Sequence, residues 1–375
     1  MIKVNKDRLI ETFLELVQVD SETGEEQEIA KVLKKKFTDL GVHVQEDNSM
    51  EKTGHGANNL ICTWEGTVDG KEDIYFTSHM DTVVPGKGIK PQIKDGYITS
   101  DGSTILGADD KAGLAAILET VQVYNEQKLP HGTVQFIITA GEESGLVGSR
   151  ALDPSLVKAS FGYAIDSDGS VGDIVVAAPT QAKLLAKIHG KTAHAGVAPE
   201  KGISAITLAA KAISKMPLGR IDEETTANIG SFAGGKQTNI VCDYVEILAE
   251  ARSLETSKME AQVQKMKQAF EQTAEEFGGH ADVDVKIMYP GYKQQAGDRV
   301  VEVARSAAKT IGRESKLTQS GGGSDANVIA GFGIPTVNLS VGYEEIHTTN
   351  ERIPVTELVK TAEMVAAIIQ EVSNS

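Results

Sequence analysis

The first half of the chain contains two kinds of apolar pattern, a helical repeat and short continuous runs. Residues 9–17, 29–33 and 110–126 repeat apolar residues at helical spacing, which predicts amphipathic helices. Short apolar runs lie between and after these segments, at residues 42–45, 59–64, 73–78, 133–139 and 161–165. Such runs are typical of buried strands, and strands that alternate with helices favour an α/β sheet flanked by helices.

The pattern changes near Pro179 and returns after Gly291. Between these points we expect strands at residues 182–189, 239–252 and 282–288, and helices at residues 202–216 and 255–277. Beyond them we expect a helix at 299–311, a strand at 335–340 and a helix at 356–372. The sequence therefore predicts a discontinuous α/β domain, residues 1–178 and 290–375, with a smaller α+β domain inserted at residues 179–289.

Composition narrows the classes of partner. The 375 residues are 40% hydrophobic and 24% charged, which suits folded cores, and the formal net charge is −16. Such an acidic surface repels nucleic-acid phosphates and anionic lipids, so we expect no nucleic acid and no membrane among the partners. The apolar runs are too short to span a bilayer, and the N-terminus lacks a secretory apolar region, so we expect a cytoplasmic protein. Cys62 and Cys242 are expected to be buried free thiols.

Polar clusters follow the predicted strands of the larger domain. His79-Met80-Asp81, Ala140-Gly141-Glu142-Glu143 and Asp166-Ser167-Asp168 come directly after or at the end of three strands. Asp109 precedes a helix, and His347 lies in the loop after the strand at 335–340. Ligands bind at the carboxyl ends of strands in open α/β sheets, so we expect these five segments to converge on one edge.

Imidazole and carboxylate without thiolate is a ligand set for zinc, with manganese or cobalt also possible. Two histidines, a bridging carboxylate and two terminal carboxylates would hold two ions, and one member of the Glu142-Glu143 pair remains as a general base. Asp81 is expected to accept the second N–H of the His79 imidazole. Isolated polar residues at strand ends are usually caps or surface groups. We interpret the following as ordinary: Asp101, Asp153, Asp168, Asp173, His43, His131, His189 and His280.

Three motifs make a family resemblance visible. They are His79-Met80-Asp81-Thr82-Val83, Gly107-Ala108-Asp109-Asp110-Lys111-Ala112-Gly113 and Gly141-Glu142-Glu143-Ser144-Gly145-Leu146. They resemble the metal-site motifs of the dinuclear zinc peptidases, which include peptidase T, carboxypeptidases, aminoacylases and succinyl-diaminopimelate desuccinylase. The similarity covers nearly the whole chain, including residues 20–26, 321–327 and 347–351, and is greatest to peptidase T and its relatives.

The resemblance implies roles that spacing alone leaves open. Asp109 would bridge two zinc ions, which His79 and Asp166 complete on one side and Glu143 and His347 on the other. Glu142 would be the general base and Asp81 the orienting carboxylate. The peptide bond after Asp109 is expected to be cis.

The resemblance also implies that the inserted domain is a lid and forms the contact surface of a homodimer. His194, in Gly190-Lys191-Thr192-Ala193-His194-Ala195-Gly196, would stabilise the oxyanion, often from the partner subunit. Asn239 and Arg252 would bind the far carboxylate of the substrate.

We expect an aminopeptidase for tripeptides or other short peptides. An N-acyl amino acid deacylase is the alternative, because it would use the same metals and base with a different pocket. A non-enzymatic binding protein on this scaffold would require a broken ligand or base position, and none is broken. A nucleotide loop at Gly321-Gly322-Gly323 is disfavoured because no Lys-Ser/Thr follows.

Overall fold

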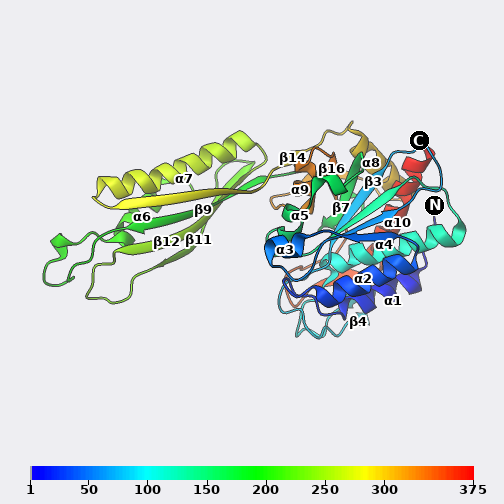
Figure 1. Cartoon of the computed structure of the whole chain (residues 1–375), viewed down its shortest axis with the longest axis horizontal. Helices are drawn as coiled ribbons and strands as arrows, with labels where there is room; N and C mark the ends of the chain where they lie inside the picture. The colour runs from blue at the N-terminus through cyan, green and yellow to red at the C-terminus, as the bar shows by residue number, and fades with distance from the viewer. Residues whose placement is uncertain (1) are drawn as a thin grey trace. The chain divides into compact units, whose positions relative to one another are not determined.

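The computed structural model describes residues 2–375, which form two compact units (Figure 1). The first contains residues up to Ala177, Lys293–Ser320 and Ser324–Ser375. The second contains Ala178–Tyr292 and Gly321–Gly323. Each unit is described by itself below.

A mixed sheet of nine strands forms the centre of the first unit. Its order is β1-β2-β6-β3-β7-β16-β8-β14, with β15 paired to β8. The strands are β1 (His43–Glu46), β2 (Leu60–Trp64), β3 (Ile74–His79), β6 (Val134–Thr139), β7 (Phe161–Ser167), β8 (Asp173–Ala178), β14 (Tyr292–Lys293), β15 (Lys316–Gln319) and β16 (Thr336–Ser340). Strands β6, β3, β7 and β16 are mutually parallel neighbours, so their carboxyl ends lie along one edge of the sheet.

Alternating residues of the central strands supply two hydrophobic cores, one on each face of the sheet. Phe76 and Phe136 belong to the larger core, whereas Tyr75 and Ile137 belong to the smaller one. The flanking helices are α1 (Lys6–Val17), α2 (Gln27–Asp39), α3 (Ser49–Thr53), α4 (Ala108–Gln127), α5 (Val147–Ala151), α8 (Arg299–Thr310), α9 (Asp325–Gly331) and α10 (Val355–Asn374), with a short 3-10 turn at Pro154–Leu156. A small separate sheet joins β17 (Arg352–Pro354), β5 (Tyr97–Thr99) and β4 (Gln92–Lys94).

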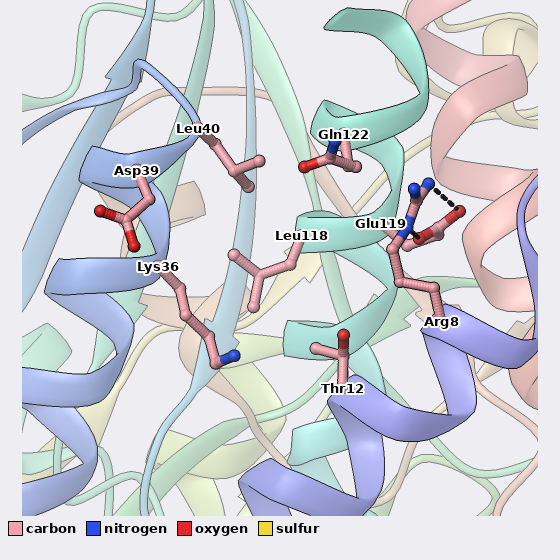
Figure 2. Close-up of a pocket in the computed structure, with 8 residues that line it drawn as sticks. All are labelled: Arg8, Thr12, Lys36, Asp39, Leu40, Leu118, Glu119 and Gln122. Carbon is pink, nitrogen blue, oxygen red and sulfur yellow. Dashed lines mark hydrogen bonds and ion pairs between the residues drawn. The ribbon is translucent and has the colours of Figure 1, made fainter. Parts of the chain in front are cut away.

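A pocket of about 190 Å³ opens between helices α1, α2 and α4 (Figure 2). It is lined by Arg8, Thr12, Lys36, Asp39, Leu40, Leu118, Glu119 and Gln122. Arg8 on α1 forms an ion pair with the buried Glu119 on α4, with Nε and Oε2 2.7 Å apart, and a second pair with the exposed Glu126 at 2.6 Å. These contacts fasten α1 to α4, which is a structural role.

The second unit is a five-stranded antiparallel sheet in the order β10-β11-β12-β9-β13, with two helices packed against it. The strands are β9 (Thr180–His189), β10 (Gly219–Arg220), β11 (Thr225–Gly234), β12 (Tyr244–Ser253) and β13 (His280–Tyr289). The helices are α6 (Ala205–Lys215) and α7 (Thr256–Glu276), and a 3-10 turn spans Pro199–Lys201. Alternate residues of β9 and β12, such as Leu184 and Ile247, are buried against the helices.

The α/β class with a mixed, helix-flanked sheet and a separate α+β unit is confirmed. Strand β11 was not predicted, because most of its residues are polar or exposed and a bulge interrupts its pairing after Ile229. Both cysteines are free and Cys62 is buried, as expected, but the prediction is wrong for Cys242, which is only partly buried. Within residues 2–375, every helix is too short or too polar to cross a bilayer.

Candidate active site

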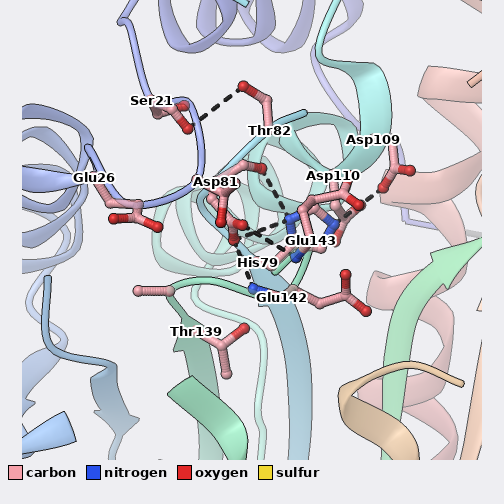
Figure 3. A network of polar contacts seen from close by, with 12 residues as sticks. Ser21, Glu26, His79, Asp81, Thr82, Asp109, Asp110, Thr139, Glu142 and Glu143 are labelled. Carbon is pink, nitrogen blue, oxygen red and sulfur yellow. Dashed lines mark hydrogen bonds and ion pairs between the residues drawn. The ribbon is translucent and has the colours of Figure 1, made fainter. Parts of the chain in front are cut away.

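The five predicted ligands of the first unit come together at the carboxyl edge of the sheet. Figure 3 shows three of them, His79, Asp109 and Glu143. His79 is the last residue of β3, Asp166 lies near the end of β7, and Glu143 follows β6 through a turn. Asp109 lies at the start of α4, where its backbone and that of Asp110 are not yet helical. The peptide bond between these two residues is cis, which confirms the expectation.

Asp109 lies between the two histidines. Its Oδ1 is 3.0 Å from Nε2 of His79, and its Oδ2 is 3.3 Å from Nε2 of His347. Nε2 of His347 is also 3.0 Å from Oε1 of Glu143, and Nε2 of His79 is 3.8 Å from Oδ1 of Asp166. The two oxygens of one carboxylate therefore face two separate groups of donors.

Charge in the cluster is strongly unbalanced. Burial, reinforced by neighbouring carboxylates, raises the pKa of Asp166 and of Glu142 well above the ordinary value. Burial alone would also raise the pKa of Asp109, but hydrogen bonds from His347 and His79 hold it well below the usual range. Hydrogen bonds to the carboxylates of Asp109 and Glu143 raise the pKa of His347 to about 10. The excess of buried negative charge suits a divalent cation.

The donor set suits a metal as well. One ligand atom from each of His79, Asp109 and Glu143 can be chosen so that all three atoms lie within 4.8 Å of one another. Imidazole nitrogen and carboxylate oxygen are ligands for zinc, and also for manganese and cobalt. The residues present therefore fit a metal site.

Asp81 differs in detail from the expectation. Nδ1 of His79 lies 2.9 Å from the main-chain oxygen of Asp81 and 3.6 Å from its carboxylate. The carboxylate instead accepts the backbone N–H groups of Glu142 at 3.0 Å and Glu143 at 3.1 Å. Asp81 thus contacts the imidazole through its backbone and fixes the glutamate turn through its side chain (Figure 3).

Sequence reasoning missed three residues that orient these groups. Glu351, which is 2% exposed, accepts the N–H groups of Leu106 and Gly107 and, at 3.0 Å, that of Asp109. Tyr343 donates its hydroxyl to Asp166 Oδ1 at 3.1 Å, and the Asn338 side chain pairs with the backbone of Asp166. Glu351 stands in the motif after His347, which is the one signal that could have identified it.

His194, Asn239 and Arg252 belong to the second unit. The segments around His194 and Asn239 pair as a short antiparallel bridge. In it, the N–H of Ala195 donates to the main-chain oxygen of Asn239 at 2.9 Å. Nδ1 of the exposed His194 accepts the N–H groups of Gly196 and Val197, both at 3.2 Å. An imidazole that accepts at Nδ1 carries its proton on Nε2, which is therefore a donor.

Arg252 is already paired. Its Nε and Nη2 donate to the two carboxylate oxygens of Glu250, at 2.9 and 3.2 Å, and its side chain is 26% exposed. A substrate carboxylate at this position would have to share the guanidinium with Glu250, a competition that the sequence did not reveal.

Three known proteins are similar to this chain over nearly its whole length. YqjE of Bacillus subtilis strain 168 is 70% identical over 368 residues, covering 98% of this chain and 99% of that protein. The crystal structure of aminopeptidase PepT from Bacillus cereus ATCC 10987 is 72% identical, with a TM-score of 0.93, covering 98% of this chain and 99% of that one. A tripeptidase structure from Staphylococcus aureus is 54% identical, with a TM-score of 0.96, covering 99% and 100%.

The family model described as peptidase family M20/M25/M40 matches residues 75–371. That span includes every residue discussed above at the metal-ligand cluster and in the second unit. The chain belongs to peptidase family M20/M25/M40.

Proposed function

We propose that this protein is a metal-dependent aminopeptidase that removes the N-terminal residue of tripeptides. The family is metal-dependent, and two highly similar structures are those of an aminopeptidase PepT and a tripeptidase. The placement of Asp109 between two histidines carries the proposal, because each oxygen of one carboxylate faces its own donor group.

Two divalent ions, with zinc expected and cobalt or manganese as substitutes, would be held around Asp109. His79 and Asp166 would complete one site, and Glu143 and His347 the other. When bound, the metals polarise the scissile carbonyl and lower the pKa of the attacking water.

Glu142 would act as the general base. Its place next to the proposed ligand Glu143, in the turn that follows β6, would bring its carboxylate to the attacking water. It would take a proton from the attacking water and return it to the leaving amine. Asp81 would hold Glu142 for this task through the backbone N–H of that residue.

The inserted unit, residues 179–289, would be the lid and the surface of a homodimer. His194 would donate its Nε2 proton to the developing oxyanion, from the same subunit or its partner. Asn239 and Arg252 would hold the terminal carboxylate of a short peptide, with Glu250 limiting the charge that Arg252 presents. We propose a cytoplasmic location, where short peptides would be the substrates.

Rates on di-, tri- and tetrapeptides, measured beside N-acyl amino acids, test the proposed reaction. Tripeptides with a free N-terminus should be cleaved best, and amidation of their C-terminus should raise KM sharply. A preference for N-acyl amino acids would replace the peptidase by a deacylase. Equal cleavage of free and amidated tripeptides would remove the role proposed for Arg252.

Metal content and rate of two neighbouring variants test the assignment of roles. Glu142→Ala should keep its metal and lose nearly all turnover, whereas Glu143→Ala should lose metal. The opposite result would show that the two roles are exchanged.

A further inference from the structure

A second group of polar residues lies behind the turn that carries Glu142 and Glu143. It consists of Thr23, Glu26, His55 and Ser144, all in the first unit, and we call it the back-side network. None of its members is a candidate metal ligand or base. The sequence pattern did not single out His55 at all.

Glu26 is the buried end of the back-side network. Its side chain is 0% exposed, and Oε1 accepts the N–H of Gly24 at 2.8 Å and lies 3.2 Å from Nε2 of His55. A fully buried carboxylate is costly unless it is hydrogen-bonded, so a residue of this kind stays in place through its partners. Glu26 therefore holds a carboxylate oxygen beside the imidazole of His55.

The imidazole of His55 packs against the turn, on the side of Gly141. Gly141 has a φ of +69°, and a Cβ added to it would lie 2.4 Å from Nε2 of His55. The imidazole therefore lies directly against the backbone of the residue before Glu142. A side chain at position 141 would collide with it, so glycine permits both the turn and the close approach.

Thr23 links His55 to the far end of the turn. Its Oγ1 is 3.2 Å from Nε2 of His55 and 2.7 Å from Oγ of Ser144. A threonine hydroxyl accepts two hydrogen bonds and donates one, so it can bond to His55 and Ser144 at the same time.

The turn is thus held from two directions. The Asp81 carboxylate holds the N–H groups of Glu142 and Glu143, and the back-side network holds Gly141 by packing and Ser144 by a hydrogen bond. We propose that Glu26 and His55 are positioning residues, which set the direction of the Glu142 carboxylate by fixing the turn from behind. The inference rests on the proposed role of Glu142 as the base in peptide hydrolysis.

Small displacements of a base are costly. A general base must lie within about 2.6–3.2 Å of the proton that it removes. A misplacement of about 1 Å can lower the rate by about 100-fold. Loss of the imidazole should therefore reduce kcat, while the metal ligands outside this turn (His79, Asp109, Asp166 and His347) and the substrate-binding residues stay in place.

His55→Leu and His55→Gln test the proposal. Leucine removes the N–H donor, whereas the glutamine amide can restore one near the position of Nε2. His55→Leu should lower kcat by about 10- to 100-fold, with KM and metal content within about twofold of wild type. His55→Gln should recover most of the loss.

His131→Leu is the matched control, because His131 is a buried histidine of the same unit that stacks on Trp64 away from the turn. It should lose stability and keep kcat. Equal loss of kcat in the His55 and His131 variants would show that His55 is merely structural. So would loss of metal in parallel with kcat. If His55→Leu does not fold, Thr23→Val replaces it in the comparison, because it removes the hydroxyl bonded to His55 and Ser144 and leaves the imidazole in place.

A crystal structure of His55→Leu separates this inference from the proposed function. The Glu142 carboxylate should shift by about 1 Å relative to wild type. An unchanged turn overturns the positioning role, whatever the substrate. Failure of wild type to cleave tripeptides, with the shift present, overturns only the proposed substrate, and the rates are then compared on the amide that wild type does cleave.

Discussion

The buried carboxylate of Glu351 holds the loop before Asp109, and its replacement tests how far that loop determines metal binding. Oε2 accepts the N–H groups of Leu106 and Gly107, each at 2.8 Å, and Oε1 accepts the N–H of Asp109 at 3.0 Å. Glu351→Leu leaves three buried donors without this acceptor. Glu351→Gln can keep two of the bonds and turns its amide N–H₂ toward the third donor.

The size of the effect follows from these contacts. A buried donor left without an acceptor costs about 1–3 kcal/mol, so three would cost roughly 3–9 kcal/mol. Burial raises the pKa of Glu351 to about 7, so removal of this carboxylate also relieves a desolvation cost. We therefore expect losses of stability at the low end of these ranges. They are about 3 kcal/mol for Glu351→Leu, which leaves three donors unpaired, and about 1 kcal/mol for Glu351→Gln, which leaves one.

Metal affinity, measured by competition with a chelator, and urea unfolding give the two readouts. Glu351→Leu should bind metal about 10- to 100-fold more weakly, and Glu351→Gln should lie between it and wild type. Arg352→Met is the control, because the neighbouring Arg352 is 46% exposed and pairs with Glu344. Wild-type metal affinity in Glu351→Leu would refute the idea that this loop sets the position of Asp109.

Other measurements test separate parts of the structure. Arg8→Met should destabilise the first unit by about 3 kcal/mol, because it leaves the buried Glu119 without its cation, whereas Glu126→Gln should change stability by less than about 1 kcal/mol. A thiol reagent should label Cys242 in the native protein and Cys62 only after unfolding, because Cys62 is buried and burial raises the pKa of its thiol; rapid native labelling of both would contradict the packing of β2. A chelator should abolish peptide hydrolysis, and zinc, cobalt or manganese should restore it; full activity of the metal-free protein would exclude metal dependence.

The helices and strands could be predicted where apolar residues follow one clear pattern along the whole element. The helix expected at residues 255–277 is α7 (Thr256–Glu276), and the strand expected at 335–340 is β16 (Thr336–Ser340). Many of the elements that were missed are short or mostly exposed, such as β4 (Gln92–Lys94) and β11 (Thr225–Gly234), whereas the missed β8 (Asp173–Ala178) is mostly buried. Their pairing depends on partners distant in sequence, which a local pattern does not contain.

The candidate site could be predicted because its residues stand at the ends of strongly apolar strands. His79 and Asp166 are of this kind, and parallel strands bring their ends together without further information. Residues that act through long-range contacts could not be found in this way. Glu351 reaches the backbone of Asp109, which lies 242 residues away in the sequence, only after folding.

The order of strands in the main sheet has a consequence for synthesis of the chain. Strand β16 lies between β7 and β8, although both of these neighbours leave the ribosome long before it. The inserted unit, Ala178–Tyr292, is nearly contiguous in sequence and can fold as soon as it emerges. At roughly 5–20 residues per second, β7 and β8 then wait roughly 8 to 30 seconds for their shared partner. During that time their facing edges are open to pairing with other chains, so a nascent chain stalled before β16 is the species most prone to aggregate.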